Sequence, residues 1–344
     1  MYIHRAACIS PQKTYPEVDL AEVVVPVNGF LSAIDPGHGR IDRNAARRMS
    51  RPVRMGMTLA MEMVAPGDHI DGLIFATASA GNAAAMQFLK QISAYDEGLL
   101  TPGDFVQSSP HALAGQIASV LHTNCYTNTH VHGGSSFEHA LTDAMLLLQE
   151  KPGAELLVGA MDEFSDYNHR IHIKAGWYDD RDSKNSNRPN GESAVGGEGC
   201  ALFHINDRRE AAVARIRSVL TFHSNDARYV AARADAWLHE ILGPDAGPVA
   251  LLSGVTGDEV TRPVYDAVAG VIPQGSSIHR YKHLCGEYPT AGAFALWLAT
   301  LKGGPAAWPS HMLEREGVLF NRPILLHHAY KGLHQSLVLV DHIA

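Results

Sequence analysis

Residues 128–149, NTHVHGGSSFEHALTDAMLLLQ, contain a strand, a tight turn and a helix in immediate succession. Gly133 and Gly134 supply the turn, and apolar residues between Phe137 and Leu148 recur on one helical face. Ser135, followed three residues later by Glu138, predicts a capping box. Such a turn directs backbone N–H groups and the positive end of a helix toward a carbonyl oxygen or an anion. We therefore expect the functional site at this turn.

Two kinds of site are disfavoured by the same stretch. Phe137 stands where the G-x-S-x-G turn of serine hydrolases needs its last glycine. His130 and His132 face the same side of a strand and could share a metal, but no Asp-His continuation follows. We expect no metal, and we interpret both histidines as structural or interface residues.

Outward from this stretch, apolar runs of strand length alternate with helical patterns, which predicts an α/β protein with mainly parallel sheets. The order of elements repeats, so we expect two halves, residues 1–206 and 207–344, with a long polar loop over 166–199. The predicted strands are 72–77, 128–132, 156–161, 200–205, 214–222, 249–253, 324–328 and 336–341. The predicted helices include 43–63, 82–95, 136–149, 228–242 and 291–301.

Composition narrows the class of protein. The chain has 344 residues, 46% of them hydrophobic, and 36 acidic residues outnumber 28 basic ones, which disfavours nucleic acid and anionic lipid as partners. The N-terminus lacks the apolar stretch of a signal peptide, and the most apolar segment, 291–301, is too short to cross a bilayer. Four widely separated cysteines fit a reducing compartment, so we expect a cytoplasmic protein. Twenty histidines are the unusual feature.

Five segments, in this order, resemble motifs of the β-ketoacyl synthases, the condensing enzymes of the thiolase fold. Residues 101–136 (TPGDFVQSSPHALAGQIASVLHTNCYTNTHVHGGSS) are similar to the approach to the family's nucleophile turn. The other four are 155–166 (ELLVGAMDEFSD), 178–205 (YDDRDSKNSNRPNGESAVGGEGCALFHI), 282–301 (KHLCGEYPTAGAFALWLATL) and 322–342 (RPILLHHAYKGLHQSLVLVDH). The resemblance implies two βαβαβαββ-type halves that form a five-layer α-β-α-β-α core.

The family's catalytic cysteine and two histidines fall on other residue types here. The ungapped match places Gly134 on the cysteine, and a glycine cannot carry an acyl chain as a thioester. The histidine positions correspond to Gly254, the nearest counterpart in a shortened segment, and Glu287. Lys282 is retained and is expected to pair with a carboxylate such as Glu287. The resemblance implies no catalytic residue and no cofactor.

The resemblance also implies roles for residues away from the triad. Tunnel-lining candidates, chosen by position relative to the family's acyl pocket, are Phe105, Val106, Met161, Phe164 and Tyr330. Condensing enzymes form dimers through the strand before the nucleophile, which places Thr129, His130 and Val131 at a dimer interface.

Three interpretations follow from the resemblance. In the first, the chain is a non-catalytic subunit of the chain-length-factor type, which pairs with an active ketosynthase and shapes its acyl tunnel, as in bacterial aryl polyene or flexirubin-type pigment pathways. The carrier protein would then be an indirect partner. In the second, it is an acyltransferase or decarboxylase that uses Glu287 as a base and Ser135 in an oxyanion site. In the third, a homodimer binds acyl groups without turnover.

Overall fold

The first half of the chain builds one mixed sheet. The computed structural model describes residues 1–26, 29–37, 40–65, 67–98, 100–178, 194–319 and 322–343. The sheet has the order β1-β7-β5-β3-β4, with β3, β4 and β5 parallel and β7 antiparallel to both β1 and β5. Its strands are β1 (Tyr2–Ile9), β3 (Gly72–Ala76), β4 (Tyr126–His130), β5 (Leu156–Asp162) and β7 (Gly199–Asn206).

The second half repeats this order. It runs β8-β13-β12-β9-β10, again with three parallel strands and two antiparallel pairings. The expected boundary at Asn206 falls between β7 and β8, and the two sheets join where Tyr2 and Ile3 pair with Arg215 and Ala214. Its strands are β8 (Ala214–His223), β9 (Ala250–Ser253), β10 (Ser277–Arg280), β12 (Ile324–Tyr330) and β13 (His334–His342).

The two sheets differ at their outer edges. In the second half, the short antiparallel strand β11 (Leu313–Arg315) pairs with β10 and covers that edge. In the first half, β4 pairs with β3 on one side, and the described part of the chain supplies no strand for its other side. One edge of the repeated fold is therefore open.

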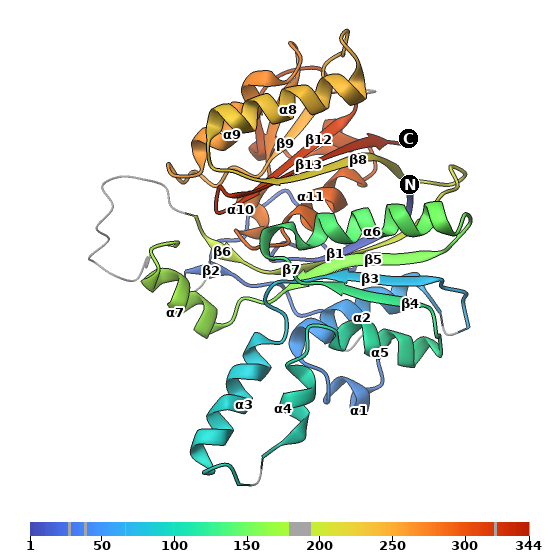
Figure 1. Ribbon diagram of the computed structural model, residues 1–344, viewed down its shortest axis with the longest axis vertical. Coiled ribbons are helices and arrows are strands. Elements are labelled where there is room, and N and C mark those ends of the chain that lie inside the picture. The colour runs from blue at the N-terminus through green and yellow to red at the C-terminus, as the bar shows by residue number, and fades with distance from the viewer. Residues whose placement is uncertain are drawn as a thin grey trace.

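Helices cover both sheets and fill the space between them (Figure 1). Two lie in the middle layer, because α6 contacts β3, β5 and β8 while α11 contacts β1, β7 and β12. All residues of α11 are buried, which explains why its sequence is apolar on every side. The middle helices are α6 (Ser136–Glu150) and α11 (Gly292–Ala299), and the outer ones are α2 (Arg51–Met63), α5 (Ala112–Leu121), α8 (Ala227–Leu242) and α9 (Arg262–Val271). The expected five-layer α/β fold is thus confirmed.

Some predicted elements differ from the observed ones. The helix predicted over 43–63 is split into α1 (Arg43–Ala46) and α2, because Pro52 lies in the first turn of α2 and starts a new helix. The loop predicted over 166–199 begins as helix α7 (Asp166–Lys174), which Ser165 caps by accepting a hydrogen bond from the Asn168 N–H. Residues 179–193 of that loop lie outside the described residues. None of the helices in the described ranges is long and apolar enough to span a bilayer.

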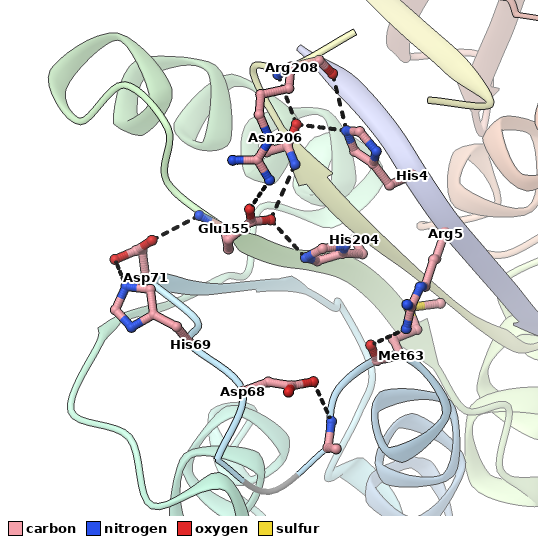
Figure 2. Close-up of polar contacts among 11 residues, drawn as sticks. His4, Arg5, Met63, Asp68, His69, Asp71, Glu155, His204, Asn206 and Arg208 are labelled. Carbon is pink, nitrogen blue, oxygen red and sulfur yellow. Dashed lines mark hydrogen bonds and ion pairs between the residues drawn. The ribbon is translucent and has the colours of Figure 1, made fainter. Parts of the chain in front are cut away.

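A polar network links the strands of the first sheet at the end where β3 and β5 begin (Figure 2). The Asp71 carboxylate accepts hydrogen bonds from Lys151 Nζ (2.5 Å), His69 Nε2 (2.8 Å) and the Glu155 N–H (2.9 Å). The Glu155 carboxylate in turn binds Arg208, and its Oε2 lies 3.0 Å from His204 Nε2. The network therefore links β3, β5 and β7 at the end of the sheet opposite to the end that carries the Gly133 turn.

A second carboxylate, Asp162 at the end of β5, links the two halves. Its Oδ1 accepts hydrogen bonds from the backbone N–H and the hydroxyl of Ser79 (2.7 and 2.8 Å) and from the Thr77 hydroxyl (2.9 Å). Its Oδ2 accepts from the backbone N–H and the hydroxyl of Thr290 (3.2 and 2.8 Å), which precedes α11. Asp162 is fully buried, so these donors depend on it as their acceptor.

Asp162→Ala should lower the free energy of unfolding by at least about 3 kcal/mol, because several buried donors lose their acceptor at once. Urea unfolding followed by circular dichroism would measure the change. Asp245→Ala, in an exposed turn, is the matched control and should change stability by less than about 0.5 kcal/mol. Equal effects of the two substitutions would contradict the role given to Asp162.

Candidate functional site

The turn between β4 and α6 lies against the second half of the chain. Gly133 has φ +59°, a conformation that favours glycine. At Gly134 the restriction is space: a Cβ atom there would lie 2.4 Å from Tyr330 Cβ and 2.9 Å from His334 Cβ. Both neighbours come from the β12–β13 hairpin. The position that matches the family's cysteine therefore has no room for any side chain while Tyr330 stays in place.

The serines of the turn are placed differently from the predicted capping box. The Ser135 side chain caps no backbone N–H, and its buried Oγ has no partner among the described residues. Ser136 Oγ instead accepts from the His132 N–H and donates to the Gly133 carbonyl oxygen, both at 2.8 Å. The capping-box prediction was wrong because Ser136 closes the turn, while Glu138 is drawn toward the second half of the chain.

Glu138 is a buried carboxyl group that sequence reasoning treated only as a cap. Its Oε1 accepts a hydrogen bond from the Ser336 hydroxyl (2.9 Å), and its Oε2 has no partner among the described residues. Burial raises the pKa of Glu138 to about 7, against the opposing effects of hydrogen bonds and of Lys282. An acidic residue on the inward face of a predicted buried helix was the signal available in the sequence.

The position of the family's first histidine is also filled. A Cβ atom on Gly254, which follows β9, would lie 2.9 Å from Lys282 Cε and 3.0 Å from the hydroxyl oxygens of Tyr265 and Tyr281. The Tyr281 hydroxyl lies 3.3 Å from Nδ1 of the buried His328. Sequence reasoning did not single out these two tyrosines or His328, because nothing local distinguishes them from core residues.

Lys282 and Glu287 form a buried ion pair, with Nζ 2.5 Å from Oε2 and the side chains 1% and 6% exposed. Lys282 Nζ also donates to the Tyr265 hydroxyl (2.9 Å). Burial alone would lower the pKa of Lys282, but Glu287 and Tyr265 outweigh it and raise the pKa above its usual value. Burial raises the pKa of Glu287, and the Lys282 ammonium group opposes that rise. Lys282 is therefore charged, and Glu287 is held as its partner.

Lys282 and Tyr330 thus occupy the space at the positions that the resemblance assigns to the family's catalytic residues. Lys282 approaches Gly254 and binds Glu287, and Tyr330 covers Gly134. The two glycines carry no side chain, and the Glu287 carboxylate is paired with Lys282. A cavity of about 420 Å³ reaches Lys282 from the surface between residues 23–26 and the ends of β9 and β10. No three His, Cys, Asp or Glu side chains in the described ranges converge as a metal ion would require.

The tunnel candidates divide into a buried set and an exposed set. Met161, Phe164 and Tyr330 are buried, with exposed fractions of 2–6%. Phe105 and Val106, on α4 (Pro102–Gln107), are 62% and 59% exposed. Helix α4 packs on α3 (Asn82–Ala94), and the two extend away from the sheets (Figure 1).

The interface candidates lie on the open edge of the first sheet. Thr129 and His130 are the last residues of β4 and are partly buried, and Val131 is 46% exposed. His130 Nε2 lies 2.8 Å from Asp143 Oδ2, and Thr129 Oγ1 lies 2.8 Å from His111 Nδ1. Side-chain contacts therefore fix this edge within the chain, while its outer backbone groups have no partner strand in the described part.

Comparisons with known proteins agree with this fold. The family model "Beta-ketoacyl synthase, N-terminal domain" matches residues 33–177. A search of curated proteins gives no match. Among solved structures, the ishigamide ketosynthase/chain length factor is similar at a TM-score of 0.72 and 18% identity, over 100% of this chain and 99% of the other.

Two further solved structures are similar over nearly the whole chain. A ketosynthase bound to a hexaketide, in complex with its type II polyketide acyl carrier protein, has a TM-score of 0.73 at 13% identity, over 99% of each chain. A β-ketoacyl synthase from Burkholderia phymatum has a TM-score of 0.72 at 15% identity, over 100% of this chain and 99% of the other. The resemblance drawn from the motifs is confirmed: residues 33–177 belong to the β-ketoacyl synthase family, and the whole chain has the thiolase-like fold of ketosynthases.

Proposed function

We propose that this chain is a non-catalytic ketosynthase-like subunit of the chain-length-factor type, which pairs with an active ketosynthase. The observation that carries the proposal is the packing at Gly134, where a Cβ atom would lie 2.4 Å from Tyr330 Cβ. A chain that cannot place a nucleophile at this turn cannot form the family's thioester there. Its contribution to synthesis is then steric, through surfaces that it presents to a partner.

The open edge of β4 supports pairing. An exposed edge presents a row of unpaired backbone N–H and C=O groups, which proteins usually cover. The second half covers its corresponding edge with β11, whereas the edge of β4 stays open in the described part of the chain. A strand of the partner that pairs with β4 near Thr129 and His130 would satisfy these groups.

The exposed apolar residues of α4 support a role in the partner's tunnel. Phe105 and Val106 are largely exposed, although burial of such side chains is favourable. In a complex they would pack on the ketosynthase and limit the room for its growing acyl chain. We further propose that the pair acts in the cytoplasm in bacterial polyketide or fatty-acid-type synthesis, of which the aryl polyene and flexirubin-type pathways are examples.

Co-expression of the chain with each condensing enzyme of the same organism that has an intact Cys, His and His set would test the proposal. We expect one of them to co-purify with this chain as a 1:1 complex on size exclusion, and the chain alone to release no CO2 from malonyl carrier protein. Decarboxylation by the chain alone that stops on Glu287→Gln would overturn the proposal in favour of the second interpretation. A chain that forms no such complex would overturn it as well.

Gly134→Cys should not create a condensing enzyme. The new side chain would displace Tyr330, so we expect a loss of about 1–3 kcal/mol in unfolding free energy and no acyl adduct by mass spectrometry. Gly115→Cys is the control, because a Cβ atom there meets nothing within 4 Å. A stable Gly134→Cys variant that carries an acyl group would show that the site is open and only lacks its nucleophile.

Phe105→Ala should shift the products of the complex toward longer chains, because a smaller side chain leaves more room in the tunnel. Product length would be read by mass spectrometry, with pairing checked on the same sample. Val260→Ala, at a position 74% exposed and distant in sequence from α4, is the control and should leave product length unchanged. An unchanged distribution in a complex that contains Phe105→Ala would remove this residue from the tunnel.

A further inference from the structure

Five of the twenty histidines form a continuous group, here called the histidine belt: His130, His132, His139, His223 and His334. The ring centroids of His132 and His139 are 4.8 Å apart, and those of His130 and His132 are 5.8 Å apart. His223 and His334 have ring centroids 4.5 Å apart and share a hydrogen bond of 2.8 Å between Nε2 and Nδ1. His223 also lowers the pKa of His139 electrostatically, together with His132 and His130.

The belt crosses both halves of the chain beside the open sheet edge. His130 ends β4, His132 precedes the turn and His139 lies on α6, while His223 ends β8 and His334 begins β13. A Cβ atom on Gly133 would lie 3.4 Å from the His334 ring, which places the second-half members against the turn. His132 and His223 are exposed, and His132 lies two residues after the end of β4, so the belt reaches the surface beside the end of this strand.

The charged and titratable groups around the belt offer little compensation for positive charge. One carboxylate, Asp143 on α6, contacts His130 and is shared with the Tyr126 hydroxyl and the Asn128 amide. Glu138, on the same helix as His139, binds Ser336 instead. The positive charge of Lys331, in the β12–β13 turn, lowers the pKa of His334. His334 in turn lowers the pKa of the buried His328. Among the described residues, Asp143 is thus the carboxylate in contact with the belt, and Lys331 brings a further positive charge to it.

Two members of the belt already resist protonation within the isolated chain. Burial, followed by the neighbouring rings of His132, His130 and His223, lowers the pKa of His139. Burial, followed by His223 and Lys331, lowers the pKa of His334. The His223–His334 hydrogen bond also needs one unprotonated ring nitrogen as acceptor, and that acceptor is lost when both rings are charged.

We propose that the histidine belt makes pairing through the β4 edge dependent on pH, with the complex formed when the belt is neutral and separated when it is protonated. This inference rests on the proposed function. Bringing a partner onto the belt removes water from the imidazoles, which costs far more for charged rings than for neutral ones. Histidine is the side chain whose ordinary pKa, about 6.5, lies closest to neutrality, so a change from about pH 7.5 to about pH 5.5 is the range that tests the proposal.

The sign of the effect follows from where protons bind. In the proposal, pairing lowers the proton affinity of the imidazoles in the belt. The separated subunits therefore bind more protons than the complex does. Falling pH therefore favours the separated subunits, and rising pH restores the complex. A belt whose histidines were paired with carboxylates of the partner would show the opposite dependence, with tighter pairing in acid.

Mass photometry and size exclusion of the co-purified complex at about pH 7.5 and about pH 5.5 would test the inference. We expect the dissociation constant to rise at least about tenfold at the lower pH. The double variant His132→Asn, His139→Asn should pair normally at the higher pH and keep most of that affinity at the lower one. His239→Asn, on the exposed end of α8, is the control and should retain the full pH dependence.

Circular dichroism of each separate subunit at the lower pH would establish that both remain folded. Equal affinities of the unmodified complex at both pH values, tighter pairing in acid, or an unchanged pH dependence in the double variant would each overturn the inference and leave the proposed function standing. Absence of any complex at the higher pH would overturn both together.

Discussion

The close approach of Tyr330 to Gly134 is the constraint on which the centre of this structure depends. The turn after β4 belongs to the first half and the β12–β13 hairpin to the second, and their contact leaves no room for a Cβ atom at the glycine. A substitution that gave the turn a reactive side chain would have to move an aromatic ring that is itself buried. The glycine at position 134 and the packing of the two halves are therefore one structural fact, and a larger residue at this position requires rebuilding that packing.

Close packing also fixes the residues at the other two positions, because Lys282 lies against Gly254 and pairs with Glu287. A buried ion pair adds little net stability over apolar residues of similar volume, whereas removing one partner leaves a buried charge without compensation. Tyr265 and the absent side chain at Gly254 complete the fit around Lys282. The residues at these positions depend on one another through direct contacts, so restoring one histidine alone would create a clash at Gly254 or an unpaired ammonium group at Lys282.

The sequence predicted the helices and strands that have a local pattern of apolar residues. It did not predict contacts between residues that are distant in the chain. The runs that became β3 and β5 are buried on both faces and therefore read as continuous apolar segments, and α6 has a clear apolar face. The strand β1 was not predicted because its burial pattern is irregular, and β10 (SIHR) was not because its four residues include only one aliphatic side chain. The positions of Gly134 and Glu287 followed from the resemblance, but Tyr330 over Gly134 and Ser336 on Glu138 join residues about 200 positions apart, which no local pattern reveals.

The repeated fold also bears on the proposed partner surface, because it leaves one edge open in the described part of the chain. The two sheets have the same strand order, so each would expose its last parallel strand, and β11 covers that strand in the second half alone. Backbone pairing at an edge depends little on side chains, so it tolerates a partner of low identity and selects poorly among partners. Selection must then come from side chains near the edge, and at the end of β4 these include His130 and His132 of the histidine belt. The same surface that gains affinity from backbone pairing would therefore gain its specificity, and its response to pH, from residues that the family's chemistry never required.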